Sequence, residues 1–397
     1  MALRDLSTEY AGRGAPLFRL ALRTGVLTVL TLGFYRFWMK TRMRRYYWSA
    51  IRPGGQPLEF VGRPTEMLTG FLTAVVVLAF YIGVVNLVLM FLSFSFFKGD
   101  APAYLLSFLG LAPMIFFAQY RARRYILART RWRGIRFGLE PGVKGYVGRA
   151  ILWWLATIAT AGILWPVKTF ELEKYKTDRT FYGDARFEQT GNRWSLMGAM
   201  KHVYLGAAIT GGAFAVVGLT EDPIWIIAIV MGALWIGLGL GYWRAESFKR
   251  LTEAKRLGEV GFRCRPRGGK IVGVYLLGGL AITALLIALL FALGVAIGLL
   301  FAVVDPALLE EGFDNLGQLS ALPAWVATLF GLTAYFAMFV FWGVLREVFI
   351  TMPIARHLAE STEIVNPDAL NGIRQRARDE FAEAEGFADA LPLGDGI

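Results

Sequence analysis

The stretch TLGFYRFWMKTRMRRYYWSA, residues 31–50, joins an apolar segment to a dense group of arginines. The apolar segment breaks at Gly33, continues through aromatic residues and runs into Arg42, Arg44 and Arg45. Three structures could have such a sequence. It could be the cytoplasmic end of a membrane-spanning helix, a nucleic-acid-binding patch, or an element that enters the membrane and leaves on the same side.

The composition of the whole chain is typical of a polytopic membrane protein. Of the 397 residues, 56% are hydrophobic and 18% are charged, and the mean hydropathy is +0.49. The net charge of +12 is best interpreted as a topology signal, because excess Lys and Arg collect in cytoplasmic loops. Nucleic acid is therefore not an expected partner.

The residues that usually carry catalysis and metal binding are scarce. The chain has one cysteine, Cys264, so no intramolecular disulfide and no Cys-rich metal site can form. It has only two histidines, and His357 and Glu360 have helical spacing without a further ligand in register. We therefore predict no enzyme, no catalytic residue, no metal and no cofactor.

Apolar segments long enough to span a bilayer, about 17 to 25 residues each, recur along the chain. Six of them have turn or charge signals on both sides: Met67–Phe97, Pro102–Ala118, Met197–Leu219, Pro223–Trp243, Ile271–Val304 and Pro323–Leu345. Two more, Phe18–Trp38 and Gly145–Trp165, are also long enough. The sequence thus allows six or eight spans.

The charged connectors favour six spans. Basic connectors lie on both sides of each of the two additional segments, and the segment between Asp305 and Leu322 has four acids and no base. If both additional segments crossed, basic connectors would face opposite compartments, against the positive-inside tendency. We therefore predict an all-α protein of the bacterial inner membrane with six spans as three hairpins, two re-entrant or interfacial segments, and both termini cytoplasmic. Eight spans remain the alternative.

Internal repetition supports the same division. The sequence from Thr31 is echoed from Thr160, each a Thr-x-Gly followed by aromatic residues and then Lys. Downstream segments resemble one another as basic helices with a glycine turn and a short strand-like piece such as Ile135–Leu139. The predicted units are a cytoplasmic N-terminus at 1–17, membrane units at 18–144 and 145–270, a third hairpin at 271–346 and a cytoplasmic tail at 347–397.

Two arginine clusters with adjacent tyrosines are the predicted lipid- or anion-binding residues. Arg binds phosphate oxygens in bidentate fashion, and Tyr and Trp settle at the membrane–water boundary. The alternative is that the clusters only signal topology. The predicted residues are Arg42, Arg44, Arg45, Tyr46, Arg121, Arg123, Arg124 and Tyr125.

The predicted re-entrant breaks are Thr31 with Gly33, and Thr160 with Gly162. A helix broken at membrane depth must bury its freed backbone groups in protein or line a wet cavity, which makes these positions candidates for a functional lining. The alternative is that the two glycines only allow helices to pack closely.

The tail from Pro367 to Leu391 alternates apolar residues with charges at helical spacing and carries five acids between Asp379 and Asp389. An acidic amphipathic helix should avoid an anionic bilayer. We therefore expect it to dock on the basic belt of the same chain or on a protein partner.

The pattern TLGxYxxWxKxRxRRYY at Thr31–Tyr47, followed by a glycine turn and a Phe strand, resembles the YjgN-like family of bacterial inner-membrane proteins, a domain of unknown function. The likeness covers about Phe18 to Arg356, and it is looser at Thr160–Tyr175, where Leu164, Trp165 and Pro166 depart from it. The resemblance implies a multi-pass protein and supplies no known activity.

Transport or handling of a lipid or another small amphiphilic or anionic molecule is the first functional expectation. Repeated units with broken helices build the binding sites of many carriers, and the basic belt could hold anionic headgroups. The alternative is a membrane scaffold or assembly factor that binds a protein partner, or a second copy of itself, through its basic layer and acidic tail.

Overall fold

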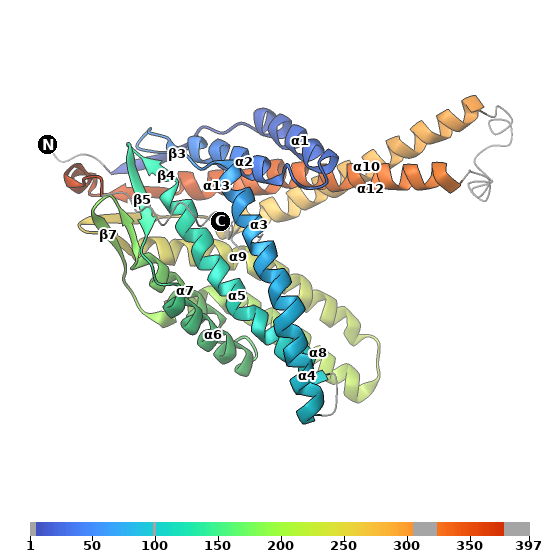
Figure 1. Cartoon of the computed structure of the whole chain (residues 1–397), viewed down its shortest axis with the longest axis horizontal. Coiled ribbons are helices and arrows are strands. Elements are labelled where there is room, and N and C mark those ends of the chain that lie inside the picture. The colour runs from blue at the N-terminus through green and yellow to red at the C-terminus, as the bar shows by residue number, and fades with distance from the viewer. Residues whose placement is uncertain (1–4, 98–100, 305–323, 377–397) are drawn as a thin grey trace. The chain divides into compact units, whose positions relative to one another are not determined.

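The structure is a computed structural model that describes residues 5–97, 101–304 and 324–376 (Figure 1). The chain forms two compact units. The first comprises Met1–Gly12, Lys40–Val272 and Ala355–Ile397, and the second comprises Arg13–Met39 and Gly273–Ile354.

The first unit is built on one antiparallel sheet of ten short strands in the described residues, in the order β2-β1-β10-β9-β8-β7-β6-β5-β4-β3. The edge strands β2 and β3 are consecutive along the chain and contact one another, so the sheet is a nearly closed barrel. The strands are β1 Leu6–Tyr10, β2 Ile51–Pro53, β3 Leu58–Phe60, β4 Thr130–Trp132, β5 Ile135–Leu139, β6 Thr180–Tyr182, β7 Ala185–Gln189, β8 Lys255–Leu257, β9 Val260–Cys264 and β10 Thr362–Val365.

The succession strand, helical pair, strand occurs five times in the described chain, and the two strands of each unit pair with one another. The units are joined by tight turns, as at Arg133 and Gly134, whose φ angles of 51° and 76° suit a two-residue hairpin. The helices of the pairs between β1 and β8 are α1 Gly14–Leu30, α2 Arg36–Ala50, α3 Pro64–Phe80, η1 Tyr81–Val85, α4 Asn86–Phe97, α5 Ala101–Ala128, α6 Val143–Ala159, α7 Trp165–Thr177, η2 Arg193–Met200, α8 Lys201–Thr220 and α9 Trp225–Glu253.

Alternate residues of the strands form an apolar core inside the barrel. Trp132, Tyr182 and Leu257 are buried there, and Phe137 packs its ring 4.7 Å from that of Tyr182. The 3-10 helix η5 (Pro367–Gly372) adds the buried Leu370 to this core. The barrel interior is therefore a packed core, and the segment after β10 helps to fill it.

The second unit packs α1 against α12 (Ala324–Arg346), together with most of α10 (Gly268–Val304) and η4 (Glu347–Thr351). The fifth pair ends in α13 (Met352–Glu360), which leads into β10. Ile282 and Leu286 of α10 and Leu345 of α12 form the buried core of this unit, and Phe18 of α1 packs on it.

The predicted all-α fold is wrong, because ten strands form the sheet. The strand-like interpretation of Ile135–Leu139 is confirmed, since β5 has those bounds. The short strand-like segments are stabilised by pairing with distant strands, which no local pattern reveals.

The predicted number of spans is also wrong. Over the described residues, five helical segments are long and apolar enough to cross a membrane: Pro64–Phe96, Arg193–Thr220, Trp225–Glu253, Gly268–Ala296 and Thr328–Glu360. The predicted span Pro102–Ala118 belongs to α5, whose side chains are described only from Gly110 onward and whose second half is basic and buries Tyr120 and Arg124 in the protein.

The C-terminal tail is described only to residue 376. Its first part docks on the sheet: the backbone N–H of Arg374 donates to Asp184 Oδ1 at 2.9 Å, and the Asp184 N–H donates to the Arg374 carbonyl at 2.9 Å. The predicted amphipathic acidic stretch beyond residue 376 lies outside the described residues.

Candidate functional site

The two segments predicted as re-entrant each form a helix, a tight turn and a second helix, with the same turn in both. Leu32 and Gly33 have φ angles of 50° and 93° between α1 and α2, and Ala161 and Gly162 have 48° and 89° between α6 and α7. These angles are all in the left-handed region, which favours glycine. The predicted break positions therefore coincide with the ends of the helices.

A threonine before each turn holds it closed. Thr31 Oγ1 donates to the Leu27 carbonyl at 2.7 Å and accepts the Tyr35 N–H at 2.9 Å. Thr160 Oγ1 makes the equivalent contacts with the Ala156 carbonyl at 2.9 Å and the Leu164 N–H at 3.3 Å. The Thr-x-Gly pattern thus satisfies backbone groups that the helix ends would leave without partners.

Apolar side chains are exposed at both turns. Leu30 and Leu32 are 73% and 89% exposed at the first, and Ile158 and Ile163 are 70% and 54% exposed at the second. Contiguous apolar surface of this kind marks a site that contacts a membrane or another molecule. The two hairpins are therefore the candidate functional elements.

We predict that Gly162→Ala lowers the free energy of unfolding by about 1–2 kcal/mol, because an L side chain is strained at a φ of 89°. A Cβ at this position meets no atom within 4 Å, so the strain would come from the backbone alone. Thermal unfolding in detergent measures the effect.

Gly148, inside α6 and equally open to a Cβ, is the matched control. Gly148→Ala should leave stability unchanged or raise it, because alanine is the better helix former. Equal effects of the two substitutions would contradict a special role for the turn.

The first predicted arginine cluster lies on α2, and the fold uses part of it. Arg45 donates to the Gly62 carbonyl at 2.9 Å, and the guanidinium of Arg44 lies 5.7 Å from the centre of the Phe60 ring. Tyr46 packs edge-on against Tyr47. Arg42 lies on the same helix, nearer to the hairpin turn than the other three residues of the cluster.

The second cluster lies on α5 and is also engaged by the protein. Arg124 is buried, and its Nε donates to the Leu139 carbonyl at 3.1 Å. Arg123 lies 4.0 Å from Glu173, and Arg121 lies over the ring of Phe117 at 4.7 Å. That these clusters bind anionic lipid remains a prediction.

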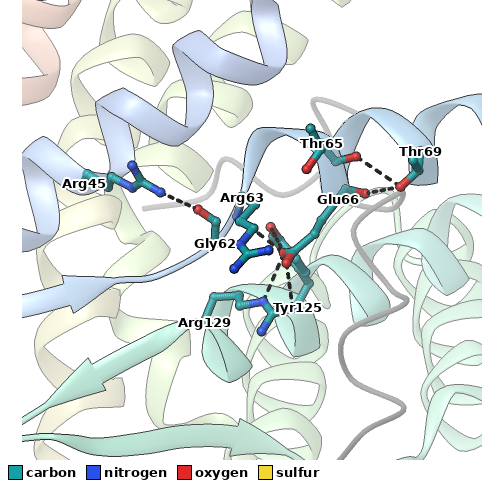
Figure 2. Close-up of polar contacts among 8 residues, drawn as sticks. All are labelled: Arg45, Gly62, Arg63, Thr65, Glu66, Thr69, Tyr125 and Arg129. Atoms are coloured by element: carbon teal, nitrogen blue, oxygen red, sulfur yellow. Dashed lines mark hydrogen bonds and ion pairs between the residues drawn. The ribbon is translucent and has the colours of Figure 1, made fainter.

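Glu66 in the first turn of α3 binds Tyr125 of α5 and Arg129, the residue that directly follows α5 (Figure 2). Arg129 holds both carboxylate oxygens, at 3.1 and 3.0 Å, and the Tyr125 hydroxyl donates to Oε2 at 3.1 Å. Oε2 also accepts a hydrogen bond from the Arg63 N–H at 3.4 Å. The preceding residue, Gly62, accepts a hydrogen bond from Arg45 of α2. The linker before α3 thus joins α2 to α5.

Glu173 on α7 is a second charged centre, which sequence reasoning missed. Its carboxylate lies 2.9 Å from Lys176 Nζ and 3.1 Å from Lys255 Nζ, with Arg123 at 4.0 Å. Burial alone would raise the pKa of Glu173, but these cations outweigh it and hold that pKa well below its usual range. The ionised form of Glu173 is therefore stabilised, and its carboxylate ties α7 to α5 and β8.

Lys168 in the first turn of α7 was also missed. It is only 5% exposed, and its ammonium lies 3.4 Å from the centre of the Trp154 ring and 3.5 Å from that of the Trp165 ring. Burial lowers its pKa to about 8. Aligning Thr160 with Thr31 would have drawn attention to it, because Lys168 then coincides with Met39.

The described residues contain no group of three or more His, Cys, Asp and Glu side chains placed to hold a metal ion. Cys264 is fully buried beside Ser361 and Thr362, and burial raises the pKa of its thiol. A buried thiol of raised pKa is a poor nucleophile.

Comparison with known proteins places the chain in a family without assigning an activity. Neither the search of curated proteins nor that of solved structures found a match. The resemblance of residues 31–47 to the YjgN-like pattern is consistent with membership of a bacterial family of unknown function. Residues 5–390, almost the entire chain, match the family model described as "Bacterial protein of unknown function (DUF898)". The chain therefore belongs to this family.

Proposed function

We propose that this chain is a multi-pass protein of the bacterial inner membrane that binds and handles anionic lipids through its two helical hairpins, α1–α2 and α6–α7. The observation that carries the proposal is the pair of identical turns with exposed apolar residues, each followed by a helix rich in basic and aromatic residues. A helical hairpin with an apolar turn and a basic second helix is suited to the boundary between acyl chains and headgroups.

The energetics favour this arrangement. Each large apolar side chain moved from water into hydrocarbon contributes about 1.5–3 kcal/mol, and each basic residue near an anionic surface about 1 kcal/mol. Leu30, Leu32 and Phe34 are all exposed at the first tip, with Arg36 and Lys40 beginning the basic helix. If the tip is inserted, its apolar side chains lie in hydrocarbon and the basic side chains of the following helix lie at the level of the headgroups.

The topology supports termini on one side of the membrane. Each of the five helical pairs leaves from and returns to the same sheet, so β1 and β10 lie on the same side however deeply the pairs enter. The basic connectors that carry the strands favour the cytoplasm as that side.

Lipid binding at the hairpins is better supported than conduction through the barrel. The strands enclose Trp132, Tyr182, Leu257 and their neighbours as a packed apolar core, and η5 adds Leu370 to it. The matching turns of α1–α2 and α6–α7 also support an origin of these two units by duplication.

Site-directed spin labelling of the reconstituted protein tests the membrane contact. Labels would be placed at Leu32→Cys and Ile163→Cys in a Cys264→Ala background, in vesicles containing phosphatidylglycerol. We expect both labels to be more accessible to oxygen than to a water-soluble nickel complex. This is the pattern of a label that lies in the hydrocarbon of the membrane. Leu290→Cys in α10 and Glu59→Cys on β3, both exposed positions, are the hydrocarbon and water references.

Aqueous accessibility at both tips, equal to that at Glu59, would overturn the proposal. Native mass spectrometry of the detergent-extracted protein distinguishes the alternative role. Retained anionic lipid supports lipid binding, whereas a stoichiometric protein partner without bound lipid would support the scaffold instead.

A further inference from the structure

The lysine that follows the aromatic residues stands one position earlier in the second hairpin (Lys168) than in the first (Lys40). With Thr160 aligned on Thr31, Lys168 takes the position of Met39, while Trp154 and Trp165 take those of Gly25 and Arg36. The turns have nearly the same φ angles, and their threonines make equivalent hydrogen bonds, in both hairpins. A lysine at this position is therefore not required for the hairpin to form.

The surroundings of Lys168 are suited to a cation but do not neutralise it. The ammonium lies between the faces of Trp154 and Trp165, where the negative face of each ring attracts it. Over the residues that the structure describes, no carboxylate lies within ion-pair distance of Nζ, and burial is the whole cause of its lowered pKa. The positive charge thus has no counter-ion from the protein.

The position of Lys168 allows an anion to reach it from outside. It lies in the first turn of α7, three residues after Trp165, close to the exposed tip of the hairpin. Trp165, one wall of the cage, is itself 39% exposed. The ammonium is therefore one side chain below the surface that we propose to contact the headgroup layer.

An ammonium on a largely buried side chain without a counter-ion is disfavoured, because partial desolvation raises the free energy of the charged form. The first hairpin avoids this cost: Met39 is apolar, and the Thr28 hydroxyl contacts its sulfur at 3.9 Å. A lysine kept at the matching position of the second hairpin, inside two indole rings, therefore indicates an anion supplied by a ligand.

We propose that Lys168 is the headgroup-binding residue of the second hairpin and pairs with the phosphate group of an anionic phospholipid, with Trp154 and Trp165 as the aromatic walls of the site. This inference rests on the proposed contact of the hairpins with lipid. Free phosphate carries the same chemistry, so the experiment must separate the two sources.

The test compares the full-length protein with its Lys168→Met variant, which copies the residue of the first hairpin. Native mass spectrometry would measure binding of short-chain phosphatidylglycerol, short-chain phosphatidylcholine and inorganic phosphate, each titrated separately. We expect Lys168→Met to weaken phosphatidylglycerol binding about tenfold, the loss of one charge-assisted hydrogen bond. Its melting temperature should stay equal or rise, because an unpaired buried charge is gone.

Lys144→Met is the matched control, since Lys144 is an exposed lysine in the first turn of α6 on the same hairpin. It should change phosphatidylglycerol affinity by less than about twofold. A lowered melting temperature in Lys168→Met would indicate a structural role and overturn the inference.

The other outcomes are equally decisive. If the wild-type protein binds phosphatidylglycerol and Lys168→Met binds it as tightly, the site at Lys168 is refuted while the proposed function stands. Inorganic phosphate binding as tightly as phosphatidylglycerol would overturn the lipid as the source of the anion. Wild-type protein that prefers phosphatidylcholine, or has aqueous spin labels at the tips, would refute the proposed function itself.

Discussion

A Gly232→Leu variant is expected to yield little folded protein, with a free energy of unfolding lowered by more than about 3 kcal/mol. Gly232 lies where α9 crosses α8, and a Cβ there would come within 2.3 Å of Thr210 Oγ1 and 2.9 Å of the Thr210 backbone nitrogen. Facing it, a Cβ on Gly206 would come within 2.9 Å of the Gly232 carbonyl oxygen. The two backbones touch, so a leucine can fit only if the helices separate.

The matched control is Gly237→Leu, five residues along the same helix, where a Cβ meets nothing within 4 Å. Size-exclusion chromatography with detection of tryptophan fluorescence, before and after heating in detergent, measures both variants. We expect Gly237→Leu to elute and melt like the wild type. Similar behaviour of the two variants would show that α8 and α9 do not pack closely.

Replacing Glu66 by glutamine is expected to lower the free energy of unfolding by about 2 kcal/mol, the usual effect of weakening charge-assisted hydrogen bonds in a partly buried pair. Arg129 would lose its bidentate partner while its side chain is only 13% exposed, and the Tyr125 hydroxyl would lose a charged acceptor. The cap of α3 should survive, because a glutamine amide oxygen can still accept the Arg63 N–H. Thermal or chemical unfolding in detergent measures the change.

Two comparisons sharpen this prediction. The pair Arg193–Glu171, at 3.3 Å with the arginine 53% exposed, is the surface control, and Glu171→Gln should cost less than about 1 kcal/mol. In a double-mutant cycle, Arg129→Met should cost little more once Glu66→Leu is present. Additive losses would show that the two side chains do not act as a pair.

The long apolar segments could be predicted from sequence because hydropathy is a local property. Five of the six predicted segments overlap the five candidate spans of the described residues, and β5 matches the strand-like piece Ile135–Leu139. The sheet could not be predicted. Strands of three residues, such as Thr130–Trp132, are too short to show a period of two, and each pairs with partners that only the complete fold brings together.

The candidate site was partly accessible to sequence reasoning. Thr31, Gly33, Thr160 and Gly162 stand at the turns because the Thr-x-Gly pattern encodes both a hydroxyl that caps the helix end and a left-handed backbone. The internal contacts of the arginines could not be predicted from the sequence. A cluster of like charges says nothing of internal partners, and the Leu139 carbonyl that holds Arg124 could be found only in the structure.

The pairing of β1 with β10 has a consequence for how the protein is made. Among the ten strands, β1 with Leu6 is synthesised first and β10 with its partner Ile364 last, so the other eight strands emerge while one edge of the barrel is still open. A chain interrupted between β9 and Thr362 exposes two unpaired strand edges, on β1 and β9, however well its helices have formed. The barrel therefore closes only after β10 has been made, and until then its two open edges are available for pairing with another strand.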